Sequence, residues 1–419
     1  MNIAVIGAGI SGLSISKMLS TNHEVTIFEK SAKPGGLIKC ERINDCLFHK
    51  VGGHVFNSKN KDVHDWFWSF FDRETEFVNA KRNAKILFKG NFIGYPIENH
   101  LYSLDKEIAF NIINELLEIN KHPLQSPFDF ENLRDYFLKN FGETLCSIYF
   151  FPYNGKLWDV DLKNVPMEWL DGKLPMPSIN DILIKNILRE DEFDMVHATF
   201  YYPKLNGSQF IIDRLKTDLK IRYNEDINQV QFKKEKLIIQ NRHYDKLIYC
   251  GDIRKLPKDI FELLTVNKVD INYIIGLKSN GTSNLFCETN STDISWLYIP
   301  ENFTKAHRII YTGNFSKTNN RGSKRLTCVV EFSGKVSYEQ MCEEIKQLPG
   351  DLKPLDYNYE PNSYIVHDHK TYSEIRKMKD ILSKNNIYIL GRFAEWEYYN
   401  MDKAIEAALN LSHEIDLID

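Results

Sequence analysis

The sequence lacks the features that define several common classes of protein. Its seven cysteines are scattered and odd in number, and no two form a C-x-x-C pair, so we expect neither a disulfide framework nor a metal site. No apolar run approaches the ~18 residues that a membrane-spanning helix needs, and no positively charged segment precedes the N-terminal apolar run. With a net charge of -4, the composition gives no argument for binding nucleic acid. These absences favour a cytoplasmic protein in a reducing environment, acting on neither membrane nor nucleic acid.

What the sequence does contain is enough length for more than one compact unit. A chain of 419 residues, 43% of them hydrophobic, indicates roughly two to three units. Aromatic residues are abundant, with 26 Phe, 21 Tyr and 6 Trp. This content suits a large flat ligand, although for any single aromatic a place in the core is the commoner interpretation.

The N-terminal residues have the pattern of a dinucleotide-binding unit. Residues 2–6 form an apolar run, a glycine-rich turn follows at once, residues 14–19 begin a helical pattern, and residues 25–28 form a second apolar run. The fingerprint glycines are Gly7, Gly9 and Gly12, where the backbone approaches a pyrophosphate. Glu29, at the tip of the second strand, is expected to accept hydrogen bonds from the adenosine ribose hydroxyls, which disfavours NADP at this site.

Two further glycine pairs follow closely, Gly35-Gly36 and Gly52-Gly53. Glycine pairs allow the backbone to lie directly against an extended cofactor, which suits FAD better than NAD. The alternative interpretation is that the pairs form two tight turns.

Residues 105–188 have a helical pattern. Apolar side chains recur there at helical spacing and are expected to share one helix face. That face consists of Leu133, Tyr136, Phe137, Phe141 and Leu145. Pro152 and Gly155 are expected to break the periodicity and leave aromatic side chains at a helix-to-loop transition. There Trp158 is expected either to stack on a nucleotide base or to belong to the core.

From about residue 220 the sequence changes to short β-branched and aromatic runs separated by polar residues. They predict a mostly antiparallel sheet, except that residues 246–250 and 387–390 are expected to be buried strands near the nucleotide. The expected strands are residues 220–223, 230–233, 236–239, 246–250, 270–277, 294–299, 308–312, 327–332 and 387–390.

We therefore predict an α/β fold with a discontinuous Rossmann-like FAD-binding domain, an inserted helical domain and a mostly antiparallel β-sheet domain. The FAD-binding domain is expected to comprise residues 1–52, 205–252 and 385–419. The helical domain is assigned to residues 100–200, and the sheet domain to residues 53–99 and 253–384.

The C-terminal segment narrows the function further. Gly391-Arg392 forms a turn, Tyr398 and Tyr399 follow, and Met401 begins a helical pattern. A guanidinium, two phenol groups and a helix N-terminus can thus face one cofactor.

Five motifs together resemble the UDP-galactopyranose mutase family, and the resemblance runs along nearly the whole chain. In chain order they are the histidine-bearing loop 48–56, the strand pair 88–96, the stretch 152–158, the strand segment 307–310 and the segment 391–401. The stretch 152–158 resembles the uridine-binding part of that helical domain, which implies that Tyr153 and Trp158 pack against the base with Lys156 between them. Five motifs in the correct order are more specific than any one of them. The resemblance implies interconversion of the pyranose and furanose forms of a sugar nucleotide in cell-surface polysaccharide biosynthesis. The expected pair is UDP-galactopyranose and UDP-galactofuranose.

The resemblance also implies FAD as the cofactor, active in its reduced form. In that family the flavin N5 is the nucleophile toward the anomeric carbon and forms a covalent flavin–sugar adduct, while UDP leaves and returns. No electrons are consumed per turnover. The implied partners are a UDP-sugar and an external reductant such as NAD(P)H, and a homodimer remains open.

The family's functional residues carry over onto matching positions. Arg308 is implied to bind the diphosphate, with Tyr364 and Tyr398 donating hydrogen bonds to it. His54 is implied to lie near the flavin N5, with a packed histidine as the alternative. The implied cofactor-binding residues are Gly7, Gly9, Gly12, Glu29, Gly35, Gly36, Gly53, Gly391, Arg392 and Met401. The implied substrate-binding residues are Tyr153, Lys156, Trp158, Lys173, Arg308, Tyr364, Tyr398 and Asn400, and the implied catalytic residues are His54, Arg308, Tyr364 and Tyr398.

Three positions depart from the family's pattern. Lys173 stands where a second phosphate-binding arginine is usual, Asn400 replaces an aspartate, and Asn57 replaces a second histidine. Lysine keeps the charge but lacks the planar fork, whereas Asn400 can still cap a helix. These departures put the identity of the sugar in question more than the reaction type.

Two other interpretations stay open. A redox flavoenzyme of the amine-oxidase or protoporphyrinogen-oxidase type shares the fingerprint and the architecture, but it would need neither a uridine platform nor a diphosphate clamp. A catalytically idle sugar-nucleotide binder has only the departures at Lys173 and Asn400 in its favour.

Overall fold

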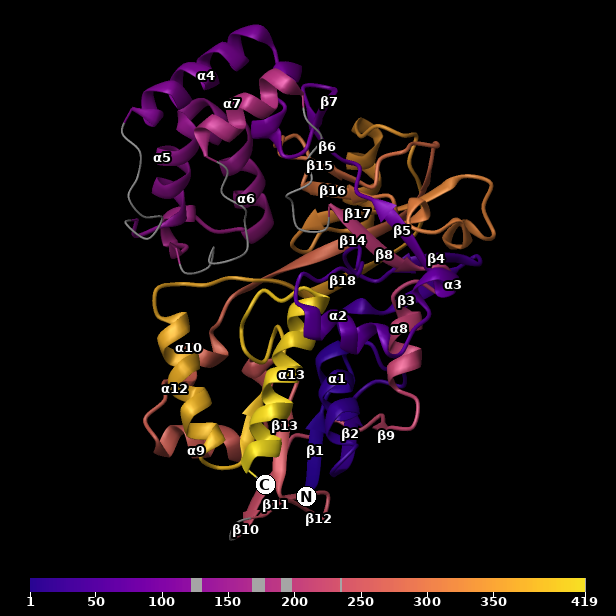
Figure 1. The fold of residues 1–419 in the computed structure, drawn as a ribbon, viewed down its shortest axis with the longest axis vertical. Helices are drawn as coiled ribbons and strands as arrows, with labels where there is room; N and C mark the ends of the chain where they lie inside the picture. Colours follow the sequence, from indigo (N-terminus) through magenta and orange to yellow (C-terminus); the bar gives the residue numbers. More distant parts are fainter. Residues whose placement is uncertain (122–129, 168–177, 190–197, 234–235, 419) are drawn as a thin grey trace.

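The N-terminal strand β1 (Asn2–Ile6) lies at the centre of a five-stranded sheet (Figure 1). The structure is a computed structural model, and it describes residues 1–121, 130–167, 178–189, 198–233 and 236–418. The strand order is β19-β13-β1-β2-β9, and every neighbouring pair is parallel. The other strands are β2 (Glu24–Glu29), β9 (Lys220–Tyr223), β13 (Lys246–Tyr249) and β19 (Ile387–Ile389). Because they come from distant parts of the chain, the predicted discontinuous Rossmann-like domain is confirmed.

Side chains of this sheet alternate between two helical layers. In β1, Ile3 and Val5 join one apolar cluster and Ala4 joins another, as the two-residue period of a strand requires. One layer consists of α1 (Ile10–Leu19), α2 (Lys61–Trp68), α8 (Gln209–Leu215) and α13 (Met401–Ile418), and the other of α9 (Lys258–Val266), α10 (Ile271–Ile275) and α12 (Thr371–Ser383). Both faces are therefore covered, as a parallel sheet requires.

A second sheet of seven strands has the order β18-β14-β17-β16-β15-β6-β7. All of its neighbouring pairs are antiparallel except β15 and β6. Its strands are β6 (Ala84–Phe88), β7 (Asn91–Gly94), β14 (Ser279–Thr289), β15 (Trp296–Tyr298), β16 (Ala306–Ile310), β17 (Leu326–Ser333) and β18 (Lys353–Ile365). α11 (Tyr338–Glu344) contributes Met341 to its apolar cluster. The prediction of a separate, mostly antiparallel sheet is confirmed.

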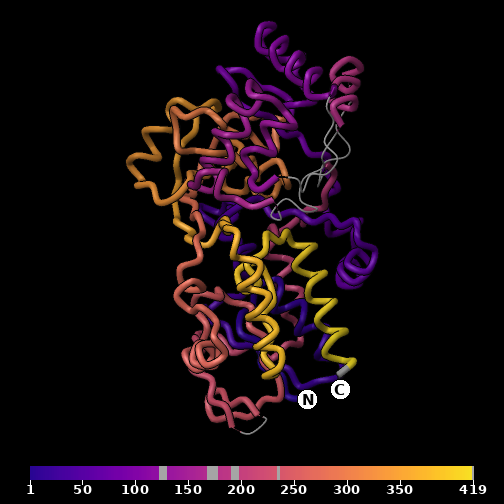
Figure 2. Tube along the Cα trace, turned by 90° about the vertical axis from the view of Figure 1, so that its left-hand side faces the viewer, coloured from indigo at the N-terminus to yellow at the C-terminus, as the bar shows by residue number. Residues whose placement is uncertain are grey.

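Four helices form the end of the molecule opposite the two termini (Figures 1 and 2). They are α4 (Lys106–Asn120), α5 (Leu133–Leu145), α6 (Phe151–Trp158) and α7 (Ile179–Leu188). α5 buries the apolar face that its sequence predicts. The apolar cluster formed by these helices also contains Trp296 and Tyr298 of the seven-stranded sheet, so the helices and this sheet share one hydrophobic core.

Smaller elements complete the chain. β3 (Cys40–Ile43) pairs with β4 (Cys46–His49), and β5 (Phe77–Lys81) pairs with β8 (Thr199–Pro203). β10 (Gln231–Lys233), β11 (Lys236–Ile239) and β12 (Arg242–Tyr244) form a three-stranded sheet, and α3 (Arg73–Glu76) is a single turn.

Two local predictions are wrong. Residues 270–277 contain α10 and not a strand, because the Asp270 side chain accepts a hydrogen bond from the Tyr273 backbone N–H at 3.1 Å and caps a short helix. Pro152 and Gly155 do not end the helical pattern, since α6 runs through both of them. Pro152 occupies the first turn of α6, where a missing N–H is tolerated.

The domain boundaries also differ from the predicted ones. The sheet domain was expected to hold all of residues 53–99 and 253–384, but α2, α9, α10 and α12 pack on the parallel sheet. Apolar patterning shows which face of a helix is buried and does not show which of two sheets that face covers.

Gly12 allows α1 to approach the first turn of the chain. A Cβ at this position would lie 1.9 Å from the Gly7 carbonyl oxygen. Because the contact is with backbone, Gly12→Ala should force α1 away and cost about 3 kcal/mol of stability. The control is Gly155→Ala in α6, where a Cβ meets no described atom within 4 Å, so the melting temperature should stay unchanged or rise. Equal melting temperatures for Gly12→Ala and the parent protein would contradict the close approach.

Candidate active site

A cavity lies where the N-terminus of α1 meets the turn before α13. The predicted residues that line it are Gly9, Gly12, Gly35, Gly36, Gly53, His54, Gly391, Arg392, Asn400 and Met401. Gly391 has a φ of 103°, and a Cβ there would lie 2.6 Å from the Ser11 Oγ, so this turn requires glycine. Tyr399, one of the two phenol groups expected to face a cofactor, also lines the cavity, and so does Cys250, to which the sequence assigned no role.

Gly7 and Glu29 support the glycine turn from the sheet. The Gly7 N–H donates to the Phe28 carbonyl at 2.8 Å. The buried Glu29 carboxylate accepts from the backbone N–H groups of Ala8 at 2.8 Å and Ser31 at 2.9 Å. The ribose contact of Glu29 stays a prediction.

Two histidines stand side by side at the cavity wall. The rings of His54 and His49 are 6.0 Å apart, and the His49 Nε2 lies 2.7 Å from the Tyr202 hydroxyl. Burial, assisted by the nearby Arg392 charge, lowers the pKa of His54 to about 4, and burial lowers the pKa of His49 to about 3. Both rings are therefore neutral at pH 7. Within the described part of the chain, the buried His54 Nε2 has no hydrogen-bond partner.

Arg392 connects the cavity to a pair of tyrosines. Its Nε and Nη2 donate to the Tyr399 carbonyl at 3.0 and 2.6 Å, and its Nη1 donates to the Ser363 carbonyl at 3.3 Å. The guanidinium carbon lies 4.4 Å from the Tyr398 ring centroid. Tyr398 is in turn nearly parallel to Tyr364, with centroids 6.2 Å apart. The two tyrosines expected at the diphosphate are thus brought together beside the cavity.

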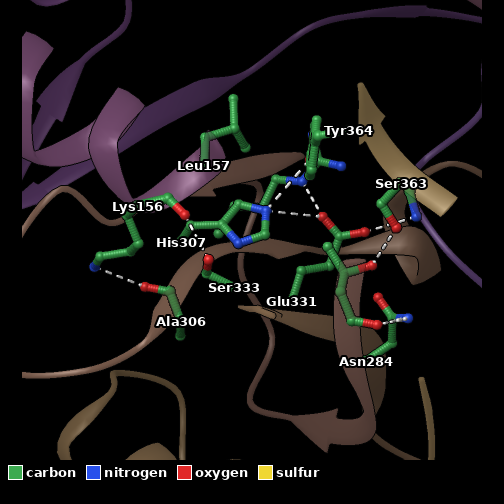
Figure 3. Close-up of polar contacts among 12 residues, drawn as sticks. Lys156, Leu157, Asn284, Ala306, His307, Glu331, Ser333, Ser363 and Tyr364 are labelled. Carbon is green, nitrogen blue, oxygen red and sulfur yellow. Dashed lines mark hydrogen bonds and ion pairs between the residues drawn. The ribbon is translucent and has the colours of Figure 1, made fainter. Parts of the chain in front are cut away.

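Glu331 is the centre of a buried charge cluster (Figure 3). Arg308 lies directly across the strand pair, and its Nε–H donates a hydrogen bond to the fully buried carboxylate. The His307 Nε2 lies 3.4 Å from the same oxygen and 3.3 Å from the Tyr364 hydroxyl. The other carboxylate oxygen accepts from the Gly52 N–H at 2.6 Å. Burial alone would raise the pKa of Glu331, but Arg308 and His307 outweigh it and hold the pKa well below its usual range.

Tyr153 reaches the same region from α6. Its ring is nearly parallel to Tyr149, with centroids 5.6 Å apart, and meets Tyr298 edge-on at 5.5 Å. The sequence did not indicate that Tyr149 and Tyr298 lie beside Tyr153, because isolated tyrosines in a tyrosine-rich chain carry no local signal.

Two residues expected at the uridine make close contacts within the protein. The Lys156 ammonium donates to the carbonyls of Ile299, Glu301 and Ala306 at 3.0, 2.7 and 3.0 Å, so its three protons are used within the protein. Trp158 is only 4% exposed and packs in the helical core, so its stacking on a base stays a prediction. Lys173 lies outside the described residues.

The parallel sheet, its glycine turn and the cavity at the strand ends define a nucleotide-binding domain of the Rossmann-like class. A family model for the NAD(P)-binding Rossmann-like domain matches residues 5–73, in agreement with this geometry.

Known proteins resemble the chain well beyond this domain. The UDP-galactopyranose mutase of Mycoplasma genitalium is 23% identical, over 99% of this chain and 94% of that protein. The dTDP-fucopyranose mutase of Escherichia coli is 27% identical, over 42% of this chain and 46% of that protein. A crystal structure of reduced UDP-galactopyranose mutase matches with a TM-score of 0.85 and 21% identity, over 99% of this chain and 96% of that one. The chain is thus similar to UDP-galactopyranose mutase along nearly its whole length, and these relatives support an enzyme of the isomerase class.

Two further features are absent from the described ranges. No helix in them is both long and apolar enough to cross a membrane. Nor do they contain three or more His, Cys, Asp or Glu side chains placed to share a metal ion.

The Glu331 cluster generates a prediction about pH. Removing one member of a buried ion pair leaves the other unpaired, so Glu331→Gln should cost about 3 kcal/mol of stability at neutral pH. Because the folded-state pKa of Glu331 is depressed, this stabilisation exists above the unfolded pKa of about 4.3 and is lost as the pH falls below it. Urea unfolding of both proteins between pH 7 and pH 3 should therefore show the difference shrinking with acid.

The matched control is Glu343→Gln, which removes a surface pair with Lys346 and should change stability by less than about 1 kcal/mol. A pH-independent difference between Glu331→Gln and the parent protein would mean that Glu331 acts through its shape and not its charge.

Proposed function

We propose that the chain is a flavin-dependent sugar-nucleotide mutase that interconverts pyranose and furanose forms, with UDP-galactopyranose and UDP-galactofuranose as the substrate pair. The observation that carries this proposal is the contact between two sites. Arg392, at the cavity, holds Tyr398 against Tyr364, and Tyr364 meets the cluster around Arg308. A cofactor site and an anion-binding site thus share one wall.

The cavity fits FAD. Its lining is rich in backbone, since a Cβ on Gly36 would lie 3.3 Å from the Gly9 Cα and a Cβ on Gly53 would lie 2.7 Å from the Ile310 side chain. The N-terminus of α1 can face a pyrophosphate, and the N-terminus of α13 can face a flavin ring. Reduced flavin bound there would supply a nucleophilic nitrogen for the anomeric carbon of the sugar.

The chain's own residues would bind and hold the leaving group. The Arg308 Nε is anchored on Glu331, and the described residues make no hydrogen bond to either of its Nη nitrogens. Those nitrogens are therefore the donors that a diphosphate would use, with the hydroxyls of Tyr364 and Tyr398 beside them. A clamp of this kind retains UDP until the sugar recaptures it. Neutral His54 at the cavity wall can hold a proton at Nε2 without adding charge.

The relatives also bear on the substrate class. Those named above are mutases of a UDP-sugar and a dTDP-sugar, which supports a pyrimidine nucleotide sugar as the substrate. An oxidase would place no demand on a diphosphate clamp, so the Arg308 cluster favours the mutase over the redox alternative.

The first test is the dependence of activity on reduced flavin. The purified protein, loaded with FAD and reduced with dithionite, should convert UDP-galactofuranose to UDP-galactopyranose without net consumption of reductant, as chromatography of the products would show. The oxidised protein is the control and should be inactive. Stoichiometric consumption of reductant or oxygen per product would favour the oxidase.

The second test concerns the diphosphate clamp. Arg308→Ala should lower kcat/KM by roughly 100-fold, because a buried diphosphate loses a charge-assisted partner worth about 3 kcal/mol. Arg308→Lys keeps a cation beside Glu331 and should fold normally, yet lose most of this activity because lysine lacks the fork. Exposed Arg321→Ala serves as the control. Parent-like kinetics for both Arg308 variants would remove Arg308 from the site.

A further inference from the structure

A second arginine, Arg82, lies among the aromatic side chains of the same sheet. It sits between β5 and β6, and its guanidinium carbon is 5.1 Å from the ring centroid of Trp296, 5.3 Å from that of Tyr95 and 5.9 Å from that of Tyr298. Its Nη2 donates to the Tyr298 hydroxyl. Three rings and one hydroxyl thus fix the orientation of a planar cation.

Strand register places this cation on the face that carries Arg308. Tyr298 in β15 is the direct cross-strand partner of Arg308 in β16. Directly opposed residues of an antiparallel pair project from the same face of a sheet. Tyr298 also contacts the ring of Tyr153, which is expected to pack against the base. Arg82 is therefore one side chain away from both the diphosphate clamp and the nucleoside platform.

The electrostatics of this arrangement favour an anion. Burial would lower the pKa of Arg82, but the hydroxyls of Tyr298 and Tyr95 hold it above its ordinary value, and Arg308 is close enough to oppose them. Two guanidinium groups on one face repel each other across a partly desolvated space. An anionic group with oxygens for both would relieve that repulsion and make charge-assisted hydrogen bonds.

We propose that Arg82 is a second phosphate-binding arginine, which contacts the diphosphate of the nucleotide sugar opposite Arg308. This inference rests on the proposed function and adds a residue to it. Arg82 is only half-buried, so a ligand can reach it. Sequence reasoning assigned it no role, because it lies outside every motif and its position becomes meaningful only through the register of β15 and β16.

The test compares ligands that differ only in the diphosphate. Calorimetric titration of UDP and of uridine should be run on the FAD-loaded parent protein, Arg82→Gln and Arg82→Lys, with exposed Arg321→Gln as a matched control. Arg82→Gln should bind UDP about tenfold more weakly and bind uridine within about twofold of the parent. Arg82→Lys should recover part of the UDP affinity, because a point charge remains. Tyr298→Phe keeps the ring, loses the orienting hydroxyl and should weaken UDP binding about threefold.

Each outcome decides a different point. Unchanged UDP affinity in Arg82→Gln would overturn the inference and leave the mutase proposal standing. Equal losses of UDP and uridine affinity, with a lower melting temperature, would also overturn it by showing a packing role. If Arg82→Gln fails to fold, Arg82→Lys and Tyr298→Phe carry the same comparison. If the parent protein binds no UDP and shows no mutase activity, the proposed function itself is contradicted.

Discussion

The geometry of the site depends on one buried carboxylate. Glu331 has no exposed surface, so its charge is tolerable only while its partners stay in place. Those partners are Arg308 across the strand pair, His307, and the backbone N–H of Gly52. Gly52 leads directly into the loop that lines the nucleotide cavity. The same carboxylate therefore orients the Arg308 guanidinium, which is expected to bind the diphosphate. Through Gly52 it also fixes the position of the loop against which the cofactor would lie.

Sequence reasoning predicts those parts of this arrangement that have local signatures. The strand, glycine turn and helix at the N-terminus lie where the fingerprint places them, and the Gly391 turn and α13 close the same cavity. Glu331 could not be found in this way, because it is 279 residues from Gly52 in the chain and belongs to an ordinary apolar strand pattern. Its role follows from tertiary contacts and from strand register, which no short motif encodes. Arg82 escapes sequence reasoning for the same reason.

Three expectations met surroundings that the sequence did not indicate, because a residue type suits more than one role. Lys156 has the charge expected of a ligand contact, yet three backbone carbonyls use its protons. Trp158 has the ring expected of a base platform, yet the helical core encloses it. In residues 270–277 the β-branched content favours a strand, but a capping aspartate and contacts to the parallel sheet give a helix. Burial and hydrogen-bond partners distinguish such roles, and a short sequence pattern specifies neither.

The position of α13 has a consequence for the order of events during biosynthesis. One wall of the cavity comes from residues 9–12 and another from residues 391–404, and α13 packs along α1. A ribosome makes the first wall long before the second, so a nascent chain carries an uncovered α1 and a half-built cavity until residues 391–418 emerge. The cavity is therefore complete only after the synthesis of α13. Loss of α13 by proteolysis or premature termination would leave a chain that keeps the glycine fingerprint and lacks one wall of the cavity.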